Sequence, residues 1–232
     1  MFDRHLLPLQ KRVLEPPAAR LARAGVSADA VTILGFAVGL AAVPLLAYGQ
    51  YMAALAVILV NRILDGLDGA LARRTRPTDR GAFLDIALDF VFYALAPFGF
   101  ALADPAANAL PAATLLLAFI GTGSSFLAFA AVAARRGMSS APYPGKGIHY
   151  LGGLTEGAET IAVFVAMCLW PYAFPAIAYV FAALCGLTTF TRWWWGWRAF
   201  AADALHGRSD RPEPPGASKT RQGKTTGVEL TS

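Results

Sequence analysis

Two neighbouring stretches decide how this chain is interpreted: Asn61-Arg62-Ile63-Leu64-Asp65-Gly66-Leu67-Asp68-Gly69-Ala70-Leu71-Ala72-Arg73, and then Gly81-Ala82-Phe83-Leu84-Asp85-Ile86-Ala87-Leu88-Asp89. Both lie in or at the ends of apolar segments long enough to cross a lipid bilayer. An aspartate at the centre of such a helix costs about 2.5–3.5 kcal/mol on insertion scales. Four aspartates in these segments therefore indicate a functional site.

The spacing of the four acids predicts that they converge. Asp65 and Asp68 are three residues apart and Asp85 and Asp89 are four apart, so each pair shares a helix face. The segment 73–80 between them is short, which favours two antiparallel neighbouring helices. All four carboxylates are then expected close together near one end of both helices.

Such a cluster of carboxylates needs neutralising charge. Hard divalent cations such as Mg²⁺ prefer oxygen ligands, and substrate phosphates usually complete their shells. Two such ions could clamp a phosphoryl group during displacement, so a diphosphate substrate is expected. The alternative is that Arg62, Arg73 and Arg80 pair with the acids as buried ion pairs. That alternative leaves unexplained the glycines beside the acids, Gly66, Gly69 and Gly81, which let a bulky ligand approach the backbone.

The composition points to lipid as the solvent. Hydrophobic residues make up 56% of the 232 residues and charged residues 15%, against about 45–50% and about 25% in a soluble domain. The formal net charge is +5, but the basic residues flank apolar segments instead of forming a basic face, so no nucleic-acid partner is expected. Cys168 and Cys185 have neither metal nor disulfide spacing and are interpreted as packing residues.

We expect an all-α, polytopic membrane protein. Spanning helices need roughly 20 mostly apolar residues, and six segments qualify, near 30–49, 52–72, 81–102, 110–134, 154–170 and 175–194. Residues 1–26 suit an amphipathic helix on the membrane surface. Residues 27–205 form the six-helix domain, and residues 206–232, rich in Pro, Gly, Ser, Thr and Lys, are expected to be a disordered cytoplasmic tail.

The distribution of Lys and Arg sets the orientation. Of 20 basic residues, 19 fall in the N-terminal segment, residues 73–80, residues 135–150 and the C-terminal segment from Arg192. The three connections on the other side, 48–51, 103–108 and 171–174, carry none. The positive-inside rule then puts both termini in the cytoplasm. Trp193, Trp194, Trp195 and Trp197 are expected to anchor the last span at the interface.

At this point the sequence resembles the CDP-alcohol phosphatidyltransferase family. The family signature reads D-x2-D-G-x2-A-R, a spacer usually of eight residues, then G-x3-D-x3-D. Every defined position matches, at Asp65, Asp68-Gly69, Ala72-Arg73, Gly81, Asp85 and Asp89. The departure is the spacer, residues 74–80, which has seven residues.

The resemblance implies a role for each matched residue. Asp65, Asp68, Asp85 and Asp89 would hold two ions of Mg²⁺ or Mn²⁺, and Asp89 would also be the general base. Gly69 and Arg73 would contact the CDP moiety. Thr78 and Thr32 match two further nucleotide-contacting positions, although the segment 29–32 lacks the Pro and Asn that the family often has there.

The resemblance also implies the reaction. A phosphatidyl group is transferred from a CDP-linked lipid to an alcohol, and CMP leaves. The expected CDP-linked lipid is CDP-diacylglycerol. Family members that use a phosphorylated acceptor often carry basic residues at the start of the fifth span, where this chain has Glu156 and Glu159. That favours a neutral polyol or an amine-bearing alcohol, unless Arg135, Arg136 or Lys146 reaches the site. Helix-end carboxylates with no acceptor role are an equal alternative for the two glutamates.

Two other functions are compatible with acidic residues in lipid. An intramembrane prenyltransferase also uses Asp-rich motifs, Mg²⁺ and diphosphates, but the full glycine and arginine pattern does not favour it. A transporter would be expected to show inverted repeats and broken helices, and neither is evident. The expected partners are CDP-diacylglycerol, an alcohol and membrane lipids, with a homodimer left open. The expected location is the bacterial inner membrane, as a multi-pass protein.

Overall fold

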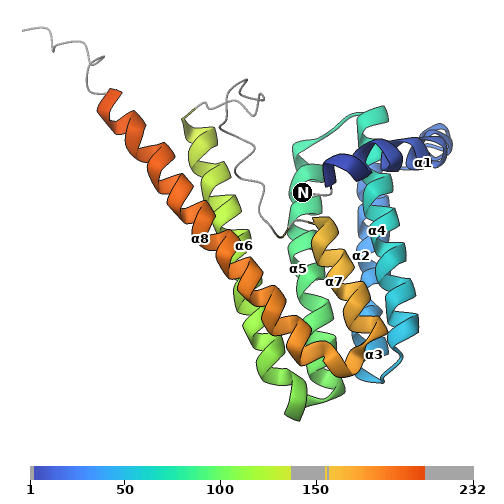
Figure 1. The fold of residues 1–232 in the computed structure, drawn as a ribbon. Coiled ribbons are helices and arrows are strands. Elements are labelled where there is room, and N and C mark those ends of the chain that lie inside the picture. Colours follow the sequence, from blue (N-terminus) through green and yellow to red (C-terminus); the bar gives the residue numbers. More distant parts are fainter. Residues whose placement is uncertain (1–2, 137–154, 156, 207–232) are drawn as a thin grey trace, which may run out of the picture. The chain divides into compact units, whose positions relative to one another are not determined.

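The helices follow the apolar segments of the sequence. The computed structural model describes residues 3–136, 155 and 157–206, and every regular element among them is helical. The elements are α1 (Asp3–Arg23), α2 (Ala28–Leu40), α3 (Ala42–Ala47), α4 (Tyr51–Arg74), α5 (Asp79–Ala103), α6 (Pro105–Arg135), α7 (Gly157–Leu169), a short 3-10 helix η2 (Pro171–Ala173) and α8 (Phe174–His206) (Figure 1). The all-α prediction is confirmed for this part of the chain.

Local sequence chemistry explains where these helices begin and end. Ser27 is the N-cap of α2 and Thr78 that of α5, each accepting a backbone N–H with its side-chain oxygen. Asp104 does the same for α6. The first predicted span is broken at Ala41, between α2 and α3. Pro44 explains the break, because proline donates no backbone hydrogen bond and its ring clashes with the carbonyl four residues earlier.

Four segments are long and apolar enough to cross a membrane: Ala28–Ala47, Asp79–Ala103, Pro105–Arg135 and Pro171–Ala201. They identify an integral membrane protein. The other two predicted spans are helical as well. However, α4 carries five charged residues from Arg62 onward, and α7 has only 13 residues. The count of six spans is therefore not established by length and hydropathy alone.

The main core consists of side chains from α3 to α8. Phe100 stacks on Tyr51 on one side and on Phe174 on the other, with ring centroids 5.6 and 4.4 Å apart. Cys168 and Cys185 are buried free thiols in this core, as expected for packing residues. A smaller core joins α1 and α2 to α4 through Leu14, Ala18, Val31 and Leu71.

Two glycines set the close packing of α2 on its neighbours. A Cβ on Gly35 would lie 3.1 Å from the Leu64 Cβ of α4. A Cβ on Gly39 would lie 2.8 Å from Phe92 of α5 and 2.9 Å from Asn61 of α4. The pair of glycines in α2 therefore lets α4 and α5 approach it on two sides, which positions the aspartate-bearing helices.

The last helix is longer than the sequence suggested. We expected the tryptophans to follow the final span, but α8 continues through all four of them to His206. Their side chains are between 43% and 79% exposed, as suits interfacial residues. The chain divides into two compact units, residues 1–194 and 195–232, and the site described below lies in the first. Residues 207–232, where a disordered tail was predicted, lie outside the described residues.

Candidate active site

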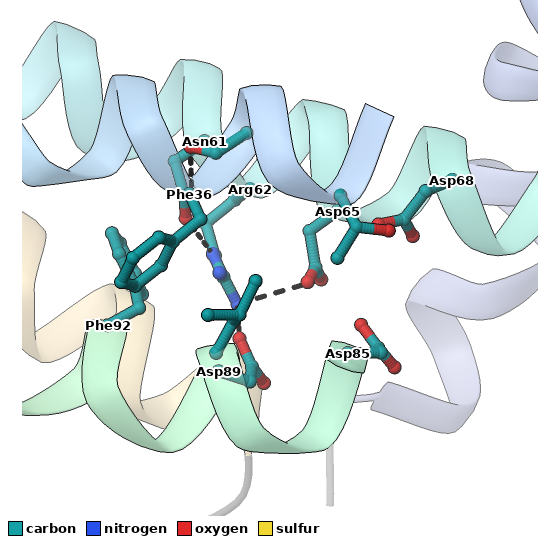
Figure 2. Close-up of a pocket in the computed structure, with 11 residues that line it drawn as sticks. Phe36, Asn61, Arg62, Asp65, Asp68, Asp85, Asp89 and Phe92 are labelled. Carbon is teal, nitrogen blue, oxygen red and sulfur yellow. Dashed lines mark hydrogen bonds and ion pairs between the residues drawn. The ribbon is translucent and has the colours of Figure 1, made fainter. Parts of the chain in front are cut away.

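Two helices bring the four aspartates around one cavity. Asp65 and Asp68 project from α4, and Asp85 and Asp89 from α5 (Figure 2). Both helices pack against α2 and α3, and the two acidic pairs face each other across the cavity. The prediction that the four carboxylates come together is confirmed. The prediction that their two helices are direct neighbours is not, because α4 and α5 pack mainly against α2 and α3 and make few contacts with each other. The space left inside the cavity has a volume of about 10 Å³. A single water molecule needs about that much.

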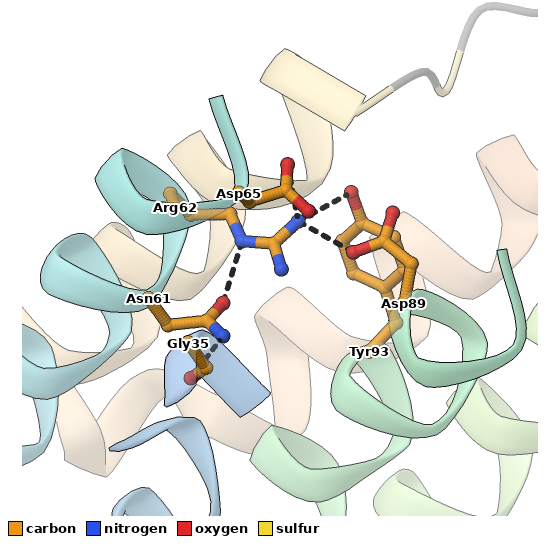
Figure 3. Close-up of polar contacts among 6 residues, drawn as sticks. All are labelled: Gly35, Asn61, Arg62, Asp65, Asp89 and Tyr93. Atoms are coloured by element: carbon orange, nitrogen blue, oxygen red, sulfur yellow. Dashed lines mark hydrogen bonds and ion pairs between the residues drawn. The ribbon is translucent and has the colours of Figure 1, made fainter. Parts of the chain in front are cut away.

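Arg62 occupies one side of this cavity. Its Nη1 donates to Asp89 Oδ1 at 2.7 Å and lies 3.6 Å from Asp65 Oδ2 (Figure 3). The Arg62 side chain is 15% exposed, whereas those of Asp65 and Asp89 are about one-third exposed. The ion-pair alternative raised from the sequence is therefore partly realised: among the described ion pairs, Arg62 is the one of the three arginines that pairs with these acids. Arg80 pairs instead with Asp29, its Nε lying 2.8 Å from Asp29 Oδ2.

Asp68 lies on the opposite side of the cavity. It is 5% exposed, and its Oδ2 is buried with no hydrogen-bond partner among the described residues. A buried carboxylate oxygen without a partner is costly unless a ligand or ion satisfies it. The donor set, four carboxylates around a small cavity, fits a hard divalent cation. Within the described ranges no three His, Cys, Asp or Glu side chains are placed to hold a metal ion, and Asp65 and Asp89 face Arg62.

A second, larger cavity adjoins the first. It has a volume of about 150 Å³ and shares Thr32, Asp68 and Asp85 with the aspartate cavity. Its other walls include Gly69, Thr78 and Gly81. Three of the residues that the resemblance assigned to the nucleotide, Thr32, Gly69 and Thr78, therefore line one pocket next to the acids. Arg73 is not in its wall, but the Arg73 Nη1 would lie 3.2 Å from a Cβ on Gly69.

The residues predicted for the acceptor are less well placed. Arg135 is exposed at the end of α6, and Glu159 is half-buried in the first turn of α7. Glu156 and Lys146 lie outside the described residues. A third cavity of about 150 Å³ does lie beside Tyr93, with walls that include Thr122, Thr160 and Arg192.

Sequence reasoning missed the residues that hold Arg62. The Asn61 side chain accepts from Arg62 Nε at 2.7 Å and donates to the Gly35 carbonyl at 2.8 Å. Phe92 and Tyr93 lie under the guanidinium, 4.2 and 5.4 Å from its carbon to the ring centroids. A signal was available, because Asn61-Arg62 is itself a polar pair in an apolar segment and such residues are costly in lipid.

The fold and the site together define a class: an integral membrane phosphotransferase whose acidic site lies between helices. The chain belongs to the CDP-alcohol phosphatidyltransferase family, whose model matches residues 26–202. This assignment sets aside the prenyltransferase and transporter alternatives. Members of the family use divalent metals.

Three comparisons give the assignment detail. The chain is 58% identical to the Escherichia coli inner membrane protein YnjF over 85% of its own length and 96% of that protein. It is 28% identical to the Mycobacterium tuberculosis phosphatidylinositol phosphate synthase PgsA1 solved with CDP-DAG bound, with a TM-score of 0.60 over 80% of this chain and 94% of that one. A second structure of PgsA1, in complex with manganese and citrate, has 27% identity and a TM-score of 0.60, over 79% of this chain and 88% of that one.

Proposed function

We propose that this enzyme transfers a phosphatidyl group from CDP-diacylglycerol to a small alcohol in a Mg²⁺-dependent reaction that releases CMP. One observation carries the proposal above all. The cavity with four aspartates opens onto a pocket lined by Thr32, Gly69 and Thr78, and the two share Asp68 and Asp85. A diphosphate that bridges the two cavities would have its nucleotide in one and its reacting phosphorus beside the acids. That PgsA1 was solved with CDP-DAG supports this donor.

The four aspartates are the metal ligands in this proposal. Asp65, Asp68, Asp85 and Asp89 would hold two Mg²⁺ ions, with Mn²⁺ as a substitute, as the manganese complex of PgsA1 supports. Bound divalent ions neutralise the diphosphate and stabilise negative charge that develops on its oxygens. Asp89 takes the proton from the acceptor hydroxyl as the general base. The acceptor oxygen then attacks the lipid-linked phosphorus in line, and CMP is the leaving group.

The nucleotide pocket follows from the same geometry. Gly69 presents no side chain to the cavity, so a ribose or phosphate can approach the α4 backbone. Thr78 caps α5 through the Gly81 N–H at 3.0 Å, which keeps the N-terminus of that helix at the pocket wall. Arg73, next to Gly69, supplies positive charge for the phosphate of the leaving CMP.

The acceptor would occupy the third cavity. Its walls offer hydroxyl groups from Thr122, Thr155, Thr160 and Tyr93, which suit a polyol, and Tyr93 also contacts Arg62 at 3.5 Å. Glu159 is half-buried on α7, one residue before Thr160. Its negative charge disfavours an acceptor that carries its own phosphate group. A neutral polyol or an amine-bearing alcohol is therefore the proposed acceptor class, with Glu156, Arg135 and Lys146 as further candidate contacts.

The proposed membrane arrangement has six spans in residues 27–205, with α4 and α7 as the two that composition alone does not establish. Both termini lie in the cytoplasm of a bacterial inner membrane, α1 lies on the membrane surface, and residues 206–232 form a tail. The likeness to an inner membrane protein supports this location. Reporter fusions after residues 26, 104 and 206 test the orientation, because only the fusion after 104 should report the far side of the membrane.

The decisive experiment for the function is a CMP-release assay. Purified full-length protein in detergent–lipid micelles is given CDP-diacylglycerol, Mg²⁺ and a panel of alcohols, each polyol paired with its phosphate ester. We expect CMP release with at least one unphosphorylated alcohol and less with its ester. No CMP release with any alcohol, from protein shown to be folded, would reject the proposal.

A further inference from the structure

Arg62 is a charged residue in the aspartate cavity that the family signature does not specify. Its guanidinium forms an ion pair with one carboxylate from each acidic pair. Arg62 Nη1 lies 2.7 Å from Asp89 Oδ1 and 3.6 Å from Asp65 Oδ2. The pairing crosses from α4 to α5, so it links the two sides of the cavity (Figure 3). Any ion that uses Asp65 and Asp89 must share them with this arginine or displace it.

The surroundings of Arg62 fix it from behind. Asn61 holds Nε at 2.7 Å and is itself bound to the Gly35 carbonyl at 2.8 Å. The guanidinium lies over the Phe92 ring at 4.2 Å, a cation–π distance. Gly39 makes room for this arrangement, since a Cβ there would lie 2.9 Å from Asn61 and 2.8 Å from Phe92. The arginine is thus held in the cavity by contacts that do not involve the acids.

With Arg62 in place, little unoccupied space remains between the four carboxylates. With Arg62 in place the cavity holds about one water-sized particle, and Asp68 keeps an unpartnered buried oxygen on the far side. Among the described residues, no three acidic side chains are close enough together to hold a metal ion as they stand. In this site, therefore, an arginine supplies part of the positive charge beside Asp65 and Asp89, while Asp68 on the other side keeps an oxygen without a partner among the described residues.

We propose that Arg62 is a resident counter-cation that competes with divalent metal for Asp65 and Asp89, so that complete metal loading requires the anionic donor. This inference rests on the proposed function, which assigns metal to the four acids. Because Arg62 is held by Asn61 and Phe92, it stays close when metal arrives and repels it. The diphosphate of the donor offsets that repulsion by adding negative charge to the same cavity.

The test is Mn²⁺ binding to the full-length protein without donor lipid, measured from the loss of the free Mn²⁺ electron paramagnetic resonance signal. R62Q should bind Mn²⁺ more tightly than the wild type by about tenfold, because one like charge near the ion, worth ~1.4 kcal/mol after solvent screening, is removed. The gain should shrink when CDP-diacylglycerol is present. The matched control is R74Q, which removes the same charge from an exposed pair with Glu15 outside the cavity and should leave Mn²⁺ affinity unchanged.

Two further variants keep the test decisive if R62Q is unstable. N61S leaves the charge in place but removes the clamp on Nε, so it should raise Mn²⁺ affinity a few-fold, and R62K should fall between wild type and R62Q. A purely structural Arg62 would instead lower the melting temperature without any gain in Mn²⁺ affinity, which would overturn the inference. Absence of Mn²⁺ binding in both the wild type and the variants would reject the metal assignment itself, and so the proposed function.

Discussion

Replacing Asp89 by asparagine is the most informative single change in the proposed mechanism. The amide has the size of the carboxyl group but cannot accept the acceptor's proton. Losing a general base costs about 10²–10⁴-fold in rate. The variant also loses the 2.7 Å charged hydrogen bond from Arg62. Because the Asp89 side chain is 31% exposed, solvent screens this bond, and the loss of stability should lie near the lower end of the range for charged hydrogen bonds, about 1–2 kcal/mol.

The assay compares CMP release and thermal unfolding for wild type, D89N and D104N. Asp104 lies outside the site and caps α6 by accepting the Ala107 N–H at 3.1 Å. Asparagine caps helices about as well as aspartate, so D104N should keep its activity. We expect D89N to release CMP at least 100-fold more slowly while most of the protein stays folded at the assay temperature. If folded D89N kept more than about a tenth of the wild-type rate, Asp89 would not be the base.

Two further predictions concern the metal and the packing. Chelation of divalent ions should abolish CMP release, and either Mg²⁺ or Mn²⁺ should restore it. Ca²⁺ should not restore it, because this ion is larger and takes more oxygen ligands. Restoration of CMP release by Ca²⁺ alone would contradict the assignment. In the core, Gly99→Ala would place a Cβ 2.7 Å from the Leu46 side chain between α5 and α3, so it should destabilise the fold by about 1–3 kcal/mol. Since Gly99 is not in the wall of the aspartate cavity, the folded fraction of this variant should release CMP at the wild-type rate. An unchanged free energy of unfolding would show instead that α3 can move aside.

Much of the site could be predicted because its residues are anomalous in lipid and regularly spaced. The carboxylate pairs share helix faces by simple periodicity, whereas their approach to each other depends on α2, which packs against both α4 and α5. The pocket formed by Thr32, Gly69 and Thr78 was also anticipated, but only through the family resemblance. Thr32 lies on another helix, and nothing in local sequence relates it to Asp68.

What the sequence did not predict depends on tertiary contacts. Arg62 was considered only as one of three possible ion-pair partners. Its position is set by Asn61, Phe92 and the missing Cβ of Gly39, which come from three helices. Likewise, residues 30–49 were expected to form one continuous span, whereas the helix breaks into α2 and α3 at Ala41. The third cavity, proposed for the acceptor, could not be predicted because Thr122, Thr160 and Arg192 belong to helices far apart in the sequence.

The most direct test of the central claim follows the acceptor oxygen through the reaction. The alcohol that releases most CMP is prepared with a heavy oxygen isotope in its hydroxyl group, and both products are analysed by mass spectrometry. In-line attack on the lipid-linked phosphorus predicts that the label appears in the phosphatidyl alcohol and that the CMP is unlabelled. Label in the CMP, or CMP release without a matching lipid product, would contradict the account.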